Sequence, residues 1–142
     1  MKILIINGPN INMLGIREKD IYGEKTYQGL IDYIAAYCAQ EKIDVSFVQS
    51  NHEGDIIDAI QGAYKVYDGI VINPAAYTHT SIAIADALMA VAVPAVEVHI
   101  SDVENREEFR KHSYTKSACK ETFSGLGFDG YVLAIKRLYD KS

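Results

Sequence analysis

The sequence lacks the features that mark several common classes of protein. Its only two cysteines, Cys38 and Cys119, form no CxxC pair or Cys/His cluster, which argues against a zinc site or a redox pair. We expect both to be free thiols, buried or half-buried, in a reducing cytoplasm. Only four consecutive apolar residues lie between Lys2 and Asn7, too few for a signal peptide or a membrane span. These absences predict a cytoplasmic protein with no membrane partner.

An excess of positive charge is also missing. Fourteen lysines and arginines stand against 19 aspartates and glutamates, and the formal net charge is -5. Nucleic acids and acidic membranes require a basic face, so neither is expected as a partner, whereas a small anion at a local positive site is compatible with the composition. With 142 residues, 49% of them hydrophobic, the chain is expected to form one domain over residues 1–142, with a core that needs no disulfides.

Three well-known catalytic or nucleotide-binding patterns are absent as well. No GxGxxG follows the first apolar run, no GxxxxGK[ST] occurs anywhere, and no serine stands in a GxSxG turn. After Lys2, no expected strand carries a lysine that could form a Schiff base. Nucleotide enzymes, esterases and Schiff-base enzymes are therefore disfavoured. Acid and base chemistry without a cofactor remains.

What the sequence does contain is an alternation of short apolar runs with amphipathic segments. The expected strands cover residues 3–6, 45–48, 69–72, 94–101 and, more weakly, 122–124. The expected helices begin after Thr26, after His52, after Thr80 or Ser81, and at Gly130. This order predicts an α/β fold, a five-stranded parallel sheet with helices on both faces. The sequence does not fix the strand order, and we predict the flavodoxin-like one.

Polar side chains follow four of these strands. In open parallel sheets, ligands bind beyond the carboxyl ends of the strands. The residues at these ends are Asn7, Asn10, Asn51, His52, Asn73, His79, His99 and Ser101. Taken singly, each has a structural explanation, since asparagine is common where turns begin and a lone histidine often bonds locally. Their convergence on one edge predicts a binding site there.

The fourth expected strand carries polar residues on one side. Residues two apart on a strand face the same way, which groups Glu97, His99 and Ser101. Glu97 could orient His99 as a proton carrier, and a buried structural pair is the alternative. A metal bound by His79, Asp86, Glu97 and His99 is conceivable, but no two of these residues have a characteristic ligand spacing.

A long loop over residues 7–23 carries Arg17 and Tyr22. Loops of this length are usually functional or disordered. A phenol with a pKa of about 10 acts as a base near neutral pH only beside a cation such as a guanidinium. The alternative is a surface loop whose Tyr22 packs on the core.

Several groups in the sequence could bind an anion. We expect the free amides of the helix that starts at Thr80, and those of Ile100 and Ser101, to contribute. Arg17 and Arg110 could supply charge, although either could equally be solvated. Arg106 is expected on the surface.

Taken together, the motifs resemble the type II 3-dehydroquinate dehydratases, and the resemblance covers nearly the whole chain. The segments that carry it are Asn7-Gly8-Pro9-Asn10, Leu14-Gly15, Arg17-Glu18, Tyr22-Gly23, Gln49-Ser50-Asn51, Asn73-Pro74, Tyr77-Thr78-His79-Thr80-Ser81, Glu97-Val98-His99-Ile100-Ser101, Arg106 to Arg110, Ser113, Gly125-Leu126-Gly127 and Gly130-Tyr131. Lys19 and Asp102 depart from the family's usual proline and asparagine. Several motifs in the right order are more specific than any one of them.

The resemblance implies a cofactor-independent hydro-lyase of the shikimate pathway, which removes water from 3-dehydroquinate by anti elimination through an enolate. It implies that Tyr22 is the base, that Arg17 stabilises its charged form, and that His99 is the acid. Asn10 would hold a water against the enolate oxygen, and Glu97 would orient its neighbours.

The resemblance also implies which residues grip the carboxylate substrate, and how subunits assemble. The implied contacts are Asn73, His79, Ile100, Ser101 and Arg110. Asp86 would reach a neighbouring subunit's site in a homododecamer built from trimers. A flavodoxin-like binding or signalling module, or a different cofactorless lyase, are the rival interpretations.

Overall fold

The computed structural model describes residues 1–16, 25–103 and 106–140 of the chain. Five parallel strands form one sheet in the order β2-β1-β3-β4-β5. The strands are β1 (Lys2–Asn7), β2 (Asp44–Gln49), β3 (Gly69–Asn73), β4 (Ala95–His99) and β5 (Glu121–Ser124). This is the flavodoxin-like strand order, so the predicted fold class is confirmed.

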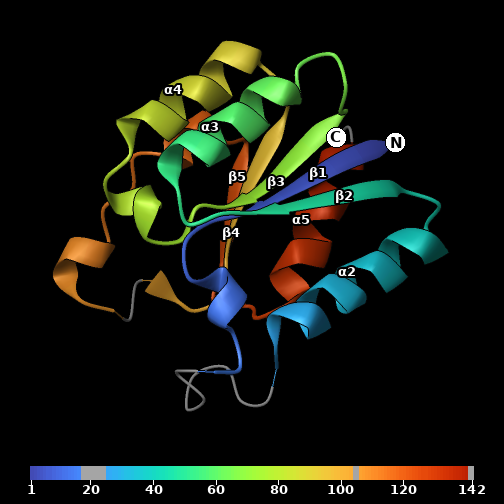
Figure 1. Ribbon diagram of the computed structural model, residues 1–142, viewed down its shortest axis with the longest axis horizontal. Helices are drawn as coiled ribbons and strands as arrows, with labels where there is room; N and C mark the ends of the chain where they lie inside the picture. Colours follow the sequence, from blue (N-terminus) through green and yellow to red (C-terminus); the bar gives the residue numbers. More distant parts are fainter. Residues whose placement is uncertain (17–24, 104–105, 141–142) are drawn as a thin grey trace.

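Within the described residues, four helices cover the two faces of the sheet, and their arrangement can be followed in Figure 1. They are α2 (Tyr27–Gln40), α3 (Glu53–Gly62), α4 (Ile82–Val91) and α5 (Asp129–Tyr139). One buried apolar cluster joins α2 and α5 to one face of the sheet, and a second joins α3 and α4 to the other. Both faces of β1, β3 and β4 are therefore buried, which explains why these strands are continuous apolar runs.

Helix starts follow the capping residues in the sequence. The Thr26 Oγ1 accepts a hydrogen bond from the Gly29 amide at 3.0 Å and begins α2. Of the two residues considered for the next cap, Ser81 is the one used, because its hydroxyl accepts the Ile84 amide at 3.0 Å. The helix therefore begins at Ile82 and not at Thr80.

The fourth strand is shorter than expected at both ends. Pro94 has no amide hydrogen to give to the ladder and lies just before β4, although its carbonyl accepts the Ile70 amide at 2.9 Å. The pairing with β5 ends at His99 and Ser124, so Ser101 lies beyond the strand. Glu97 and His99 do share one side of β4, as predicted, whereas Val96 and Val98 on the other side belong to the core cluster under α2 and α5.

Short 3-10 turns lie in the connections between strands and helices. They are η1 (Ile11–Met13), η2 (Ala75–His79), η4 (Glu108–Arg110) and η5 (Lys116–Ala118). The helical turn expected from residue 105 is the single turn η4, and residue 105 itself lies outside the described residues.

Two composition-based expectations can be compared with the described part of the chain. Cys38 is a buried free thiol and Cys119 a partly buried one, as predicted. Burial raises the pKa of the Cys119 thiol to about 12, so this thiol stays protonated at neutral pH. None of the helices in the described ranges has both the length and the apolar character needed to cross a bilayer.

Thr122 on β5 offers a test of the local packing. Among the described residues its buried Oγ1 has no hydrogen-bond partner. Replacing Thr122 by valine keeps the shape and removes a desolvated hydroxyl, so we expect the free energy of unfolding to rise by roughly 1 kcal/mol. Thermal or denaturant unfolding measures this, with Thr26→Val as a control that loses a helix cap and should lower stability. A Thr122→Val protein no more stable than the original would contradict the description of the Thr122 Oγ1 as a buried hydroxyl without a hydrogen bond.

Candidate active site

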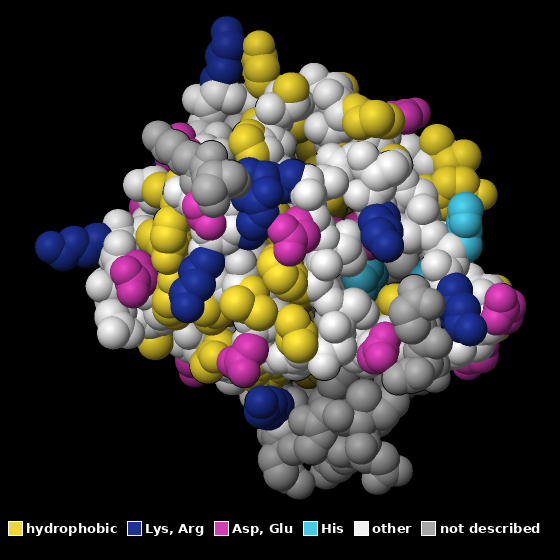
Figure 2. Space-filling model, turned by 180° about the vertical axis from the view of Figure 1, so that it is seen from behind, with side chains coloured by type: hydrophobic (Ala, Val, Ile, Leu, Met, Phe, Trp, Pro, Cys, Tyr) yellow, Lys and Arg dark blue, Asp and Glu magenta, His cyan; other side chains and the backbone are white. Residues whose placement is uncertain are grey.

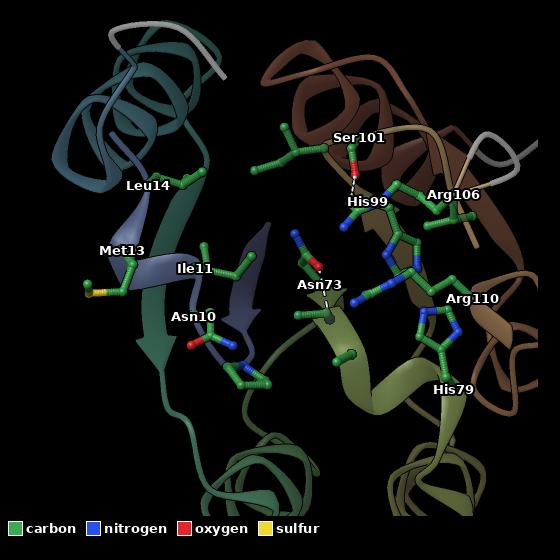
Figure 3. Close-up of a pocket in the computed structure, with 15 residues that line it drawn as sticks. Asn10, Ile11, Met13, Leu14, Asn73, His79, His99, Ser101, Arg106 and Arg110 are labelled. Carbon is green, nitrogen blue, oxygen red and sulfur yellow. Dashed lines mark hydrogen bonds between the residues drawn. The ribbon is translucent and has the colours of Figure 1, made fainter. Parts of the chain in front are cut away.

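A cavity of about 260 Å³ lies beyond the carboxyl ends of β1, β3 and β4. Its wall consists of Pro9, Asn10, Ile11, Met13, Leu14, Asn73, Ala75, Ala76, His79, His99, Ile100, Ser101, Val103, Arg106 and Arg110. Figure 3 shows the residues after β1 on one side, the histidines and arginines on the other, and Asn73 between them. The ends of β1, β3 and β4 therefore converge on one cavity as predicted, whereas Asn7 and the residues expected after β2, Asn51 and His52, do not line it.

The predicted site residues divide into four groups. Those that line the cavity are Asn10, Asn73, His79, His99, Ile100, Ser101 and Arg110. Glu97 lies behind His99 and contacts it. Asp86 is exposed on α4 and does not line the cavity. Arg17 and Tyr22 lie outside the described residues.

His99 and Glu97 form a short, buried pair. The His99 Nε2 lies 2.6 Å from the Glu97 Oε2, and the two residues are 7% and 1% exposed. A carboxylate can only accept a hydrogen bond, so Nε2 carries the proton that joins them. This leaves Nδ1 as the ring nitrogen available to a ligand. The pair is buried, but His99 also lines the cavity, so it can do more than hold β4 together.

His79 is oriented by the main chain. Its Nδ1 lies 2.7 Å from the carbonyl oxygen of His112, which can only accept, so Nδ1 is the donor. The neutral ring therefore turns a bare Nε2 away from this contact. With this tautomer His79 can accept a hydrogen bond from a ligand hydroxyl through Nε2.

Asn73 is held from two sides. Its Oδ1 accepts the Ala75 amide at 3.0 Å, and its Nδ2 donates to the Tyr131 hydroxyl at 2.9 Å. Tyr131, fully buried on α5, in turn donates to the Asn7 Oδ1 at 2.6 Å. One Nδ2 hydrogen is thereby used, and the second is left for a ligand.

The backbone around Asn73 is closely packed. The Gly8 amide donates to the Asn73 carbonyl oxygen at 2.7 Å, and a Cβ on Gly8 would lie only 2.6 Å from the Pro74 carbonyl oxygen. Asn10 and Ala75, both in the cavity wall, adopt left-handed backbone conformations with φ of 71° and 53°. An alanine in this region is strained, and such strain is concentrated at functional sites.

Two arginines give the cavity its charge. The Arg106 Nη1 donates to the Ser101 Oγ at 3.2 Å, so the expectation that Arg106 is a solvated surface residue was wrong. The Arg110 Nε lies 2.6 Å from the Glu107 Oε2. The backbone amide of Glu107 lowers the pKa of this carboxyl, Arg110 lowers it further, and the pair stays ionised at neutral pH.

The described wall carries two arginines and two histidines but no carboxylate. Figure 2 shows the histidine side chains on one side of the visible face, with lysine or arginine side chains beside them. An anion fits this lining better than a cation or a neutral apolar ligand.

The start of α4 does not contribute to this site. Residues of its first turn are absent from the described wall, and the Ser81 hydroxyl donates to the Glu53 Oε2 on α3 at 2.5 Å. The expected anion site at this helix start was therefore wrong: the cap residue faces α3, because α3 and α4 pack side by side.

The metal alternative finds no support in the geometry. Within residues 1–16, 25–103 and 106–140, no group of three or more His, Cys, Asp or Glu side chains is arranged to hold a metal ion. His79 points to the His112 carbonyl and His99 to Glu97, so the four residues considered as ligands do not form one cluster.

Three contributors escaped the sequence analysis. Arg106 could have been suspected from its place four residues before Arg110 in a charged segment. Tyr131 stands in the motif Gly130-Tyr131 but was given no role, and Thr115 carries no signal, because a hydroxyl partner 58 residues from Asn73 or 18 from Glu97 becomes visible only in the fold.

Comparisons with known protein families and sequences give matches over nearly the whole chain. The family described as dehydroquinase class II matches residues 1–139. A 3-dehydroquinate dehydratase from Clostridium acetobutylicum is 56% identical over 138 residues, which cover 97% of this chain and 96% of that protein. A protein of the same name from Clostridium perfringens is 54% identical and covers 99% of both chains.

Solved structures give the same result. A type II dehydroquinase from Butyrivibrio crossotus superposes with a TM-score of 0.95 at 56% identity, over 97% of each chain. One from Propionibacterium acnes has a TM-score of 0.92 at 42% identity, over 96% of this chain and 94% of that one. With the family model matching residues 1–139 and relatives matching nearly its full length, this chain belongs to the class II dehydroquinase family.

Proposed function

We propose that this protein is a 3-dehydroquinate dehydratase, a hydro-lyase that reversibly converts 3-dehydroquinate to 3-dehydroshikimate in the shikimate pathway. The reaction is an anti elimination of water through an enolate and needs no cofactor. The observation that carries the proposal is the Glu97–His99 pair, which opens into a cavity whose described wall is cationic. The substrate is a carboxylate with several hydroxyl groups, which suits this lining.

In this proposal His99 is the acid. In the doubly protonated ring, Nε2–H stays bonded to Glu97, and the Nδ1–H on the opposite side gives its proton to the departing hydroxyl, which leaves a neutral ring. A positioned acid of this kind contributes typically 10²- to 10⁴-fold to a rate.

Tyr22 is the base and Arg17 stabilises its charged form. This assignment rests on the sequence motif, since both residues lie outside the described part of the chain. The tyrosinate removes the proton next to the ketone, which is acidified because the resulting anion is an enolate. Asn10, at the cavity wall, holds a water against the enolate oxygen.

The remaining wall residues bind the substrate. Arg110 is the charged partner for the carboxylate, and the backbone of Ile100 and Ser101 adds hydrogen-bond donors. The free Nδ2 hydrogen of Asn73 and the bare Nε2 of His79 can bind hydroxyl groups. These contacts fix the ring between acid and base.

Asp86 points to assembly of several copies. It lies on the exposed side of α4, between Ile82 and Met89, which are 57% and 56% exposed. Residues four before and three after it share its helix face, so a carboxylate stands in an apolar stripe. We infer that this face packs on a neighbouring subunit, whose site Asp86 completes, in a cytoplasmic homododecamer built from trimers.

The assembly can be disrupted at this stripe. Met89→Glu places a second charge in the contact, and we expect sedimentation velocity to show a species of lower mass. The control Val66→Glu changes a residue of similar exposure, 50%, and should leave the mass unchanged. Unaltered sedimentation of the Met89→Glu protein would remove the stripe from the interface.

A direct assay tests the activity. The product contains a conjugated enone, so its absorbance reports turnover of 3-dehydroquinate without added metal or cofactor. A family member with this activity should turn over the substrate in simple buffer. Absence of turnover would exclude the proposed reaction, and binding of 3-dehydroquinate without turnover would point to the binding-module alternative.

A further inference from the structure

Behind the Glu97–His99 pair lies a chain of three hydroxyl groups. The Thr115 Oγ1 is 2.5 Å from the Glu97 Oε1, and the Thr78 Oγ1 is 3.0 Å from the Glu97 Oε2. The Thr78 Oγ1 also lies 2.7 Å from both the Thr115 Oγ1 and the Ser113 Oγ. We call Ser113, Thr78 and Thr115 the hydroxyl chain. Both threonines are almost fully buried, at 1% and 0% exposure, and Ser113 is half-buried.

The hydrogens of this chain run toward Glu97. The Lys116 amide donates to the Ser113 Oγ at 3.1 Å, so Ser113 accepts there and can donate its own hydrogen inward. Each hydroxyl has one hydrogen, and a carboxylate only accepts. Ser113 donates to Thr78, the single hydrogen of Thr78 goes to Thr115 or to the Glu97 Oε2, and Thr115 donates to the Glu97 Oε1. Hydrogen bonds in such a chain strengthen one another, and the last one acts on the carboxylate.

The hydrogen bond between Thr115 and Glu97 is not explained by closeness in the sequence or in the sheet. Thr122 is the partner of Glu97 in the β4–β5 register, one strand away, yet its Oγ1 makes no hydrogen bond within the described residues. Thr115 is 18 residues from Glu97 and still makes the shorter of the two threonine contacts with its carboxylate. The protein therefore provides a threonine that bonds to Glu97 and a neighbouring threonine that does not.

The segment that carries Thr115 is tied to the site at several points. It includes Arg110 in the cavity wall and the His112 carbonyl that orients His79. The Tyr114 amide donates to the Thr78 carbonyl oxygen at 2.7 Å. This segment and the turn after β3 therefore hold the hydroxyl chain in place from both sides.

We propose that Thr115 is a positioning residue for the acid: its hydroxyl, supported by Thr78 and Ser113, holds the Glu97 carboxylate so that His99 keeps its proton on Nε2 and presents Nδ1 to the substrate. The kinetic part of this inference rests on the proposed function, since it concerns the same site. The structural part, which concerns the proton on the His99 Nε2, can be tested without any measurement of turnover.

The kinetic test compares two substitutions at one position. Thr115→Val keeps the shape and removes the hydroxyl, whereas Thr115→Ser keeps the hydroxyl and removes a methyl group. We expect Thr115→Val to lower kcat roughly ten- to a hundredfold with little change in KM, because a buried carboxylate oxygen loses its donor. Thr115→Ser should restore most of kcat. Equal losses in both variants would mean that Thr115 only packs, and would overturn the proposal.

The spectroscopic test uses ¹⁵N NMR of the histidine rings in the whole protein. The chain has only four histidines, so the His99 signals can be assigned from a His99→Gln protein. We expect Thr115→Val to shift the His99 Nε2–H resonance, and Ser113→Ala, a change at a half-buried position, to shift it in the same direction by less. Thr122→Val, which removes an unbonded hydroxyl, should leave it in place.

The outcomes of the two tests distinguish a failure of the hydroxyl chain from a failure of the proposed function. A His99 resonance unmoved in both Thr115→Val and Ser113→Ala would overturn the hydroxyl chain, whatever the activity. If the Thr115→Val protein does not fold, the His99 resonance of the Ser113→Ala protein becomes the deciding measurement. A protein without dehydratase activity whose His99 resonance still responds to Thr115 would refute the proposed function and leave the hydroxyl chain supported.

Discussion

Replacing His99 with alanine is expected to lower kcat by about 10²- to 10⁴-fold while the protein stays folded. The substitution removes the only described group that lines the cavity and is hydrogen-bonded to a buried carboxylate. Glu97 keeps the Thr115 hydroxyl as a donor and its contact with the Thr78 hydroxyl, so it is not left without partners. Steady-state kinetics by the enone absorbance, with circular dichroism as a check on folding, measures the effect.

The matched control is His52→Ala. His52 is exposed before α3 and is not part of the described cavity wall, so its loss should leave kcat near the original value. A His99→Ala protein with near-original kcat would mean that another group protonates the departing hydroxyl. An equal loss in both variants would indicate a general effect of histidine removal on the fold.

Replacing Tyr22 with phenylalanine is expected to reduce kcat on a similar scale, by about 10²- to 10⁴-fold, through the loss of one oxygen atom. A phenol with a pKa of about 10 is almost fully protonated at neutral pH, so it needs a nearby cation to act as a base. Arg17, five residues earlier, is that cation in our proposal, and Arg17→Ala should reduce kcat in parallel. Both residues lie outside the described part of the structure, so kinetics is the direct test.

Tyr64→Phe provides the control, since Tyr64 is 54% exposed just after α3 and is not part of the described cavity wall. It should retain full activity. Near-normal turnover of Tyr22→Phe would show that the base is a different group. A large rise in KM with unchanged kcat would instead assign Tyr22 to substrate binding.

The sequence was a good guide to the sheet because local patterns determine its strands. The residues 3–6 and 69–72 are continuous apolar runs, and both lie inside strands buried on both faces. The caps at Thr26 and Ser81 were visible for the same reason, since a cap depends on residues three positions apart. The length of β4 was less predictable, because its end depends on where β5 stops pairing.

The site was predictable as far as it follows from the rule that ligands bind beyond the carboxyl ends of parallel strands. That rule places Asn73 and His99 together, and the fold does so. It does not say which way a helix start points, and the start of α4 faces Glu53 and not the cavity. It also gives no sign of Thr115, whose role depends on a hydroxyl contact across 18 residues of chain.

The link from Asn7 through Tyr131 to Asn73 has a consequence for how the site forms during synthesis. Tyr131 lies on α5, 124 residues after Asn7 and 58 after Asn73. A growing chain emerges from the ribosome with β1, β3 and β4 before α5 is available. Until then Asn73 lacks the Tyr131 hydroxyl that orients its amide, so this part of the candidate site is completed only when the last helix docks. In the proposed site, the orientation of Asn73 is therefore fixed only at the end of translation.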